Sequence, residues 1–93
     1  MLKAINIIMT TINNVIIDGL GVNNKKFQVL HELNENNTIM DVKQIIFNRF
    51  NIPPKIYYFV LGSKSPTDNQ TLKEIDLKPE STLYVRLRAF SKF

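Results

Sequence analysis

The sequence predicts an α+β domain in which a sheet packs on one amphipathic helix. Three observations support this fold class. Two strand-like stretches come first, a capped helical pattern follows, and two more strand-like stretches come after it. A chain of 93 residues can bury one hydrophobic core but is too short for a second. We therefore expect a single domain over residues 1–93.

Two stretches of alternating residues predict a first hairpin over residues 3–33. One side of its two strands is formed by Ile5, Ile7, Met9, Phe27, Val29, His31 and Leu33. Between the stretches, Asn-Asn pairs flank Asp18, Gly19 and Gly21, which is typical of a loop. This loop is expected at about residues 13–24.

A helix is predicted over about residues 38–50. Its apolar residues recur at helical spacing, at Ile39, Val42, Ile46 and Phe50. Thr38 stands at the N-cap position, and Asp41 three residues later makes a near capping box. The helix should end near Asn51, because Asn tolerates a left-handed conformation and Pro53 with Pro54 cannot continue a helix.

Two later strands are predicted at about residues 56–62 and 82–88. The first is rich in β-branched and aromatic residues and enters a turn at Gly62. The second alternates apolar residues with polar or aromatic ones, as expected for a strand with one buried face. Between them, Thr71 and Glu74 have the spacing of a capping box and indicate a short helical turn.

The composition narrows the classes of function. The chain has no cysteine, which excludes disulfides, thiolate zinc sites and a cysteine nucleophile. No apolar run approaches the roughly 20 residues needed to span a bilayer, and the N-terminal stretch is a poor signal peptide. We expect an intracellular protein, cytoplasmic or nuclear, without membrane association. The net charge of +4 gives only mild attraction to acidic surfaces.

The residues from about 28 to 88 resemble ubiquitin, and the predicted order of elements is that of its β-grasp fold, a mixed sheet packed on one helix. Matching positions include Thr38-Ile39, Val42-Lys43, Ile46, Ile52-Pro53-Pro54, Lys64, Asp68, Thr71-Leu72, Glu80-Ser81-Thr82-Leu83 and Leu87-Arg88. The resemblance implies a structural ion pair between Lys43 and Asp68. It also places a set of apolar residues in the core: Val29, Leu33, Ile39, Val42, Ile46, Phe59, Leu72, Leu77, Leu83, Val85 and Leu87.

The N-terminal part departs from the ubiquitin pattern. A first strand that starts near Lys3 leaves more residues than ubiquitin's tight hairpin turn holds, so the favoured interpretation is an insertion at about residues 13–24. Such a long first hairpin is also similar to the ubiquitin-like domain of the largest splicing-factor-three-A subunit of the spliceosome. An alternative register makes residues 15–19 the first strand and leaves residues 1–12 as an added arm.

Two departures argue against conjugation and catalysis. Ubiquitin and its conjugable relatives end in Arg-Gly-Gly, whereas in this chain Arg88 is followed by Ala89-Phe90-Ser91-Lys92-Phe93 and no Gly-Gly pair occurs. The only histidine, His31, falls among the expected core-facing positions of the second strand, and Glu32 beside it should point to the opposite face. We expect that the protein is not an enzyme and has no metal site and no cofactor.

The resemblance also indicates where a partner would bind. Ubiquitin's recognition face centres on an isoleucine, a valine and a histidine, and the matching positions here are Val60, Arg86 and Tyr84. With their neighbours, the candidate binding residues are Tyr58, Val60, Lys64, Tyr84, Arg86 and Arg88. The expected partner is an acidic or amphipathic segment of a protein, such as a ubiquitin-pathway receptor, bound by a monomeric domain. RNA contact is the alternative function, and an ordinary solvated sheet face is the third interpretation.

Overall fold

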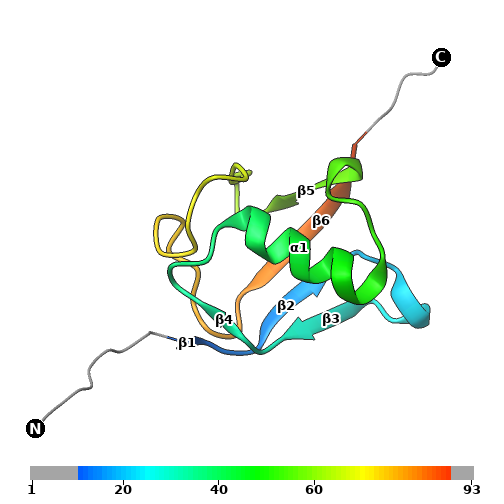
Figure 1. Cartoon of the computed structure of the whole chain (residues 1–93), viewed down its shortest axis with the longest axis horizontal. Helices are drawn as coiled ribbons and strands as arrows, with labels where there is room; N and C mark the ends of the chain where they lie inside the picture. Colours follow the sequence, from blue (N-terminus) through cyan, green and yellow to red (C-terminus); the bar gives the residue numbers. More distant parts are fainter. Residues whose placement is uncertain (1–10, 89–93) are drawn as a thin grey trace, which may run out of the picture.

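The computed structural model describes residues 11–88, which form a mixed sheet with one helix lying across it (Figure 1). The elements are β1 (Thr11–Ile12), β2 (Val15–Asp18), the 3-10 helix η1 (Val22–Asn24), β3 (Phe27–Leu30), β4 (Leu33–Asn34), α1 (Ile39–Phe50), the 3-10 helix η2 (Pro54–Ile56), β5 (Tyr57–Val60) and β6 (Thr82–Leu87). The main sheet has the strand order β3-β2-β6-β5, with β2 and β6 parallel and the other neighbours antiparallel. A separate two-stranded sheet pairs β1 with β4. The predicted α+β fold is confirmed.

Helix α1 begins and ends as its sequence signals predict. The Thr38 Oγ1 accepts the Asp41 backbone N–H at 3.1 Å, and the Asp41 Oδ2 accepts the Thr38 N–H at 2.9 Å. This reciprocal capping box satisfies donors that the first helical turn cannot pair internally. At the other end Asn51 has φ of 59°, the left-handed conformation that terminates a helix.

The first turn of α1 is also tied to the loop that precedes β6. The Ile39 N–H donates to the Gln70 carbonyl at 2.9 Å, and the Met40 N–H donates to the Asp68 carbonyl at 3.0 Å. Together with the cap, these bonds give each early N–H of the helix a partner. The loop therefore serves as part of the N-terminal cap and is held against the helix.

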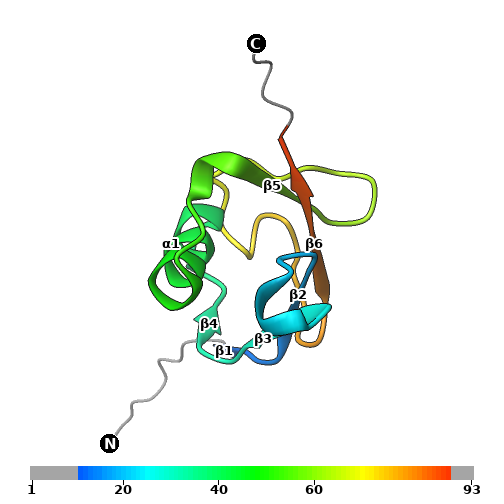
Figure 2. The same ribbon diagram turned by 90° about the vertical axis from the view of Figure 1, so that its right-hand side faces the viewer.

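The hydrophobic core lies between α1 and the inner face of the sheet (Figure 2). Its side chains are almost completely buried and come from every layer: Ile12, Val15, Ile17, Leu30, Leu33, Ile39, Val42, Ile46, Tyr57, Phe59, Leu72, Leu77 and Leu83. Burying one such side chain contributes about 1.5–3 kcal/mol. Apolar packing thus supplies most of the drive to fold in a chain that has no cysteine.

The first hairpin differs from the favoured prediction. Strand β2 pairs antiparallel with β3, with Val15 opposite Leu30, and parallel with β6, with Ile16 opposite Thr82. The insertion expected at about residues 13–24 is therefore wrong, because residues 15–18 are the central strand of the sheet. The alternative register is the one observed for this strand. The proposed similarity in hairpin length to the spliceosomal domain depended on the insertion and is withdrawn, and a strand starting near Lys3 lies outside the described residues.

The alternation assumed for the second strand is also wrong. Leu30 and Leu33 are both fully buried, although they lie three positions apart and would point to opposite faces of a regular strand. The change of side occurs at His31 and Glu32, which belong to neither β3 nor β4 and are exposed. As a result Val29, opposite Ile16, lies on the outer face of the sheet and not in the core.

The later strands lie close to their predicted positions, with β5 and β6 somewhat shorter than expected. Thr71 and Glu74 exchange the two hydrogen bonds of a capping box, at 2.8 and 3.1 Å, but they open a turn and not a helix. Leu87, which the resemblance placed in the core, is 72% exposed because it ends β6 at the edge of the packed region. Val85 is half-buried and packs against the core.

Lys43 is the one charged side chain in the core of the described residues. Its side chain is 3% exposed, and its Nζ lies 2.7 Å from the Asp68 Oδ1, whose side chain is 43% exposed. The ammonium also sits 5.5 Å from the centre of the Tyr57 ring. The contact joins the buried side of α1 to the loop before β6, so this loop meets the helix through both backbone and side-chain bonds.

Tyr57 packs its ring against Phe59 and Lys43, but its hydroxyl is buried without a hydrogen-bond partner among residues 11–88. Burial raises the pKa of this hydroxyl well above its usual value near 10, and the negative charge of Asp68 raises it further. Above about pH 10 the hydroxyl can therefore ionise in the unfolded chain but not in the folded one, so the fold loses stability as the pH rises.

We predict that Asp68→Asn lowers the free energy of unfolding by about 2 kcal/mol, because it strands the buried Lys43 ammonium. The value is below that of a fully buried pair because water reaches the Asp68 carboxylate. The matched control is Asp76→Asn, since Asp76 forms a solvent-exposed ion pair with Lys78. We expect this variant to change the free energy of unfolding by less than about 1 kcal/mol. Urea unfolding at pH 7 compares them; equal changes in the two variants would refute a structural role for the pair.

We also predict that Tyr57→Phe leaves stability at pH 7 unchanged or raises it by up to about 1 kcal/mol, because it removes a buried hydroxyl that has no partner. Above about pH 10 the parent protein should lose stability more steeply than the variant, since only in the parent does unfolding allow this hydroxyl to ionise. Urea unfolding at several pH values gives both results. A marked loss of stability in the variant at pH 7 would contradict the prediction.

Candidate functional site

Strands β5 and β6 present one row of side chains to the core and another to the opposite side. Tyr57 and Phe59 point inward, so Tyr58 and Val60 between them lie on the outer face. The antiparallel register places Tyr58 opposite Arg86 and Val60 opposite Tyr84. Figure 2 shows α1 on the other side of the sheet, and no helix or strand of residues 11–88 covers this outer face.

The outer face of β5 and β6 combines aromatic and cationic groups. The Arg88 guanidinium lies 5.4 Å from the centre of the Tyr58 ring, a cation–π arrangement. The Arg88 N–H donates to the Ile56 carbonyl at 2.9 Å, which keeps the chain beside β5 after β6 has ended. Tyr84 is 47% exposed, and Arg86 makes no ion pair with any residue that the structure describes. The structure thus brings five of the candidate binding residues onto one surface.

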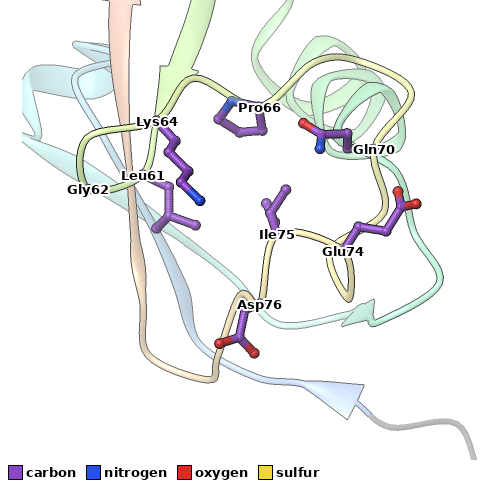
Figure 3. A pocket seen from close by; sticks show the side chains of 8 residues that line it. All are labelled: Leu61, Gly62, Lys64, Pro66, Gln70, Glu74, Ile75 and Asp76. Carbon is purple, nitrogen blue, oxygen red and sulfur yellow. The ribbon is translucent and has the colours of Figure 1, made fainter.

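Lys64, the sixth candidate, lies elsewhere. Backbone hydrogen bonds of 2.8 and 3.1 Å between Leu61 and Lys64 close the turn that follows β5. The Lys64 side chain points into a cavity of about 460 Å³ whose apolar wall includes Leu61, Pro66 and Ile75 (Figure 3). Lys64 is therefore assigned to this cavity and not to the outer face of β5 and β6.

The acidic residues of that cavity already have partners. The Glu74 Oε1 accepts the Thr71 N–H at 2.8 Å, and the Asp76 Oδ1 accepts from the Lys78 Nζ at 2.9 Å. Neither carboxylate is buried or paired with another acid, so the cavity lacks the arrangement that general acid–base chemistry requires. We assign no catalytic role to it.

The outer face extends beyond the strands that the sequence singled out. In the registered pairs, Asp18 of β2 stands beside Tyr84 on one side and beside Phe27 of β3 on the other. Phe27 is 49% exposed. Asp18 was missed because residues 13–24 were interpreted as a loop, and Phe27 was missed because it was placed on the core-facing side of the second strand. The sequence around Asp18 offers only a short run of β-branched residues, Val15, Ile16 and Ile17, and the alternation of their burial is seen only in the structure.

His31 does not occupy the core-facing position expected for it. It is exposed, and its Nδ1 lies 2.8 Å from the Asn14 Oδ1. Its neighbour Glu32 accepts the His31 backbone N–H at 3.1 Å and forms an ion pair with Arg49. The imidazole therefore has no carboxylate partner and faces no nucleophile within the described part of the chain.

Residues 11–88 contain neither a metal-binding cluster nor a membrane-spanning helix. No three His, Asp or Glu side chains gather where they could hold a metal ion. No helix in this span has the length and apolar character that crossing a bilayer requires. The outer face of the sheet remains the candidate site.

Comparison with known families agrees with this fold. Residues 20–90 match the ubiquitin family, and this span contains β3, α1, β5 and β6. The chain belongs to the ubiquitin family. Strand β2 precedes the matched span, yet it pairs with β3 and β6 in the middle of the ubiquitin-like sheet. In a comparison with curated proteins, no sequence matches the chain.

Proposed function

We propose that this ubiquitin-like domain is a non-catalytic protein-interaction module that binds its partner through the outer face of the sheet. The observation that carries the proposal is the placement of Tyr58, Val60, Tyr84 and Arg86 as neighbours on two paired strands. Aromatic residues and arginine are enriched in protein interfaces, where a ring supplies contact area and a guanidinium supplies orientation. An acidic or amphipathic protein segment fits this chemistry.

The charge of the face explains why the partner should differ from ubiquitin's own. Arg86 occupies the position of a valine in ubiquitin. An apolar side chain of a partner that packed on Arg86 would remove the guanidinium from water. That burial is unfavourable unless a carboxylate faces the charge. We therefore propose a partner that places an acidic residue opposite Arg86 and an apolar residue on Tyr84 and Val60.

RNA contact is the second candidate function, and the exposed Tyr84 beside Arg86 is the observation that favours it. A base can stack on a tyrosine while an arginine holds its phosphate. A net charge of +4 is modest for an RNA-binding domain, which makes protein binding the stronger proposal.

We predict that Arg86→Glu abolishes binding to a synthetic acidic amphipathic peptide, and that Tyr84→Ala weakens it about tenfold by removing roughly 1.4 kcal/mol of contact. Arg86→Val should instead gain affinity for a ubiquitin-binding helix. Lys73→Glu is the control for charge reversal, since Lys73 is exposed and lies outside the sheet. Fluorescence anisotropy measures all four.

The same assay with a single-stranded RNA probe separates the two functions. Tight binding of RNA that is lost in Arg86→Glu, with no binding of the peptide, would favour the RNA function. Binding of the peptide that neither Arg86→Glu nor Tyr84→Ala changes would remove the face from consideration.

We further propose that the domain is not conjugated to other proteins, because the residues that follow Arg88 do not include the Gly-Gly pair of conjugable relatives. Incubation with ubiquitin-activating enzyme and ATP should give no thioester adduct, whereas ubiquitin in the same reaction should give one. Non-reducing gel electrophoresis shows the adduct directly. An adduct on this chain would exclude the proposal.

A further inference from the structure

We infer that the binding face continues across β2 to β3, and that it takes an amphipathic helix lying across the strands with apolar residues seven positions apart and a basic residue between them. The inference rests on the proposed function and specifies its partner. It concerns two residues, Phe27 and Asp18, that are not among the six candidate binding residues indicated by the resemblance to ubiquitin.

The geometry starts from one row of registered residues that crosses all four strands of the main sheet. Phe27 is paired with Asp18, Asp18 with Tyr84, and Tyr84 with Val60. Paired residues of neighbouring strands point to the same face. Because strands lie about 4.8 Å apart, Phe27 and Tyr84 stand about 10 Å apart on the outer face.

The two residues that lie about 10 Å apart, Phe27 and Tyr84, are both exposed and aromatic. Phe27 is 49% exposed and Tyr84 is 47% exposed, and they are the two large exposed apolar side chains of the outer face. Asp18 lies between them, half-buried, and forms no ion pair with any residue of the described span. A partner that covers both rings must therefore also cover a carboxylate.

A helix fits this row better than an extended segment does. Strands β2 and β6 lie inside the sheet, so their backbone groups are paired with neighbouring strands. An extended segment laid across them would leave its own N–H and C=O groups without partners, whereas a helix pairs these groups internally. Seven residues of helix rise about 10.5 Å, which matches the separation of the two rings.

The charges then set the pattern of the partner helix. A residue at position i+3 or i+4, halfway between the two apolar residues, lies over Asp18 and should be lysine or arginine. Arg86 stands two residues beyond Tyr84 on β6, and Lys25 and Lys26 immediately precede Phe27. Acidic residues are therefore expected on the helix flank toward Arg86 and at the end that covers Phe27. A uniformly acidic helix would place a carboxylate against Asp18.

The test uses two synthetic helical peptides of about 18 residues, roughly 27 Å long, with leucines at i and i+7 and glutamates on the flanks. They differ only at i+4, which is lysine in one and glutamate in the other. With the full chain, fluorescence anisotropy should show about tenfold tighter binding of the lysine peptide. Asp18→Lys should reverse this preference, and Asp18→Asn should abolish it.

Phe27→Ala should weaken the lysine peptide about tenfold. Phe47→Ala is the matched control, because Phe47 is an exposed phenylalanine on α1 and the helix lies on the other side of the sheet (Figure 2). It should leave binding unchanged. Urea unfolding of each variant establishes that the fold is retained, and Asp18→Asn serves if Asp18→Lys does not fold.

The outcomes separate this inference from the function on which it rests. If Tyr84→Ala weakens the peptide while Phe27→Ala and the Asp18 variants do not, the binding face ends at β6 and the inference is overturned. Equal affinity for the two peptides overturns it as well. If Tyr84→Ala and Arg86→Glu also leave binding unchanged, the proposed function fails together with it.

Discussion

The contact between the start of α1 and the loop before β6 is the constraint on which the rest of the domain depends. The chain between β5 and β6 contains no helix or longer strand, yet it must deliver β6 to the middle of the sheet. It is fixed by the Lys43 pair with Asp68 and by the two helix N–H groups that donate to Asp68 and Gln70. Buried Leu72 anchors its far side in the core. A polar connection and an apolar anchor together define where β6 begins.

The position of the candidate site depends on this arrangement, because the loop fixes β6. The outer side chains of β6, however, contribute little to the stability of the fold. Along β6, Leu83 points into the core and Tyr84 points away from it. One face of the strand therefore stabilises the fold, and the other is available for binding. Changing Tyr84 or Arg86 removes little buried surface and should leave folding intact. The fold can therefore keep the ubiquitin architecture while presenting an aromatic and cationic surface in place of an apolar one.

Sequence reasoning located α1 and the outer face of β5 and β6 because each carried a local signal. Thr38, Asp41 and the two prolines bracket the helix, and six residues of β6 show their alternation plainly. Strand β2 gave no such signal, since it has four residues between Asn-rich and Gly-rich segments. Its place in the sheet comes from pairing with β6, which is a tertiary contact that no local pattern reports.

The same difficulty misplaced the second strand. Phe27, Val29, His31 and Leu33 alternate as a single strand would, but the chain leaves the ladder at His31 and Glu32 before β4. This change of phase allows Leu30 and Leu33 both to reach the core. The position of Lys64 also depends on tertiary structure, because the turn that follows β5 places it at the cavity lined by Leu61 and Ile75.

The parallel pairing of β2 with β6 has a consequence for the order in which the protein is made. The two central strands come from opposite ends of the described chain, so a nascent chain emerging from the ribosome has the β2–β3 hairpin and α1 long before β6 exists. During that interval one edge of β2, with its unpaired N–H and C=O groups, is open to other chains. A sheet completed by its last strand also forms slowly, because the long loop must close before any contact rewards it. Protection of the nascent hairpin, by a chaperone or by fast synthesis, would matter more for this domain than for one built from neighbouring strands.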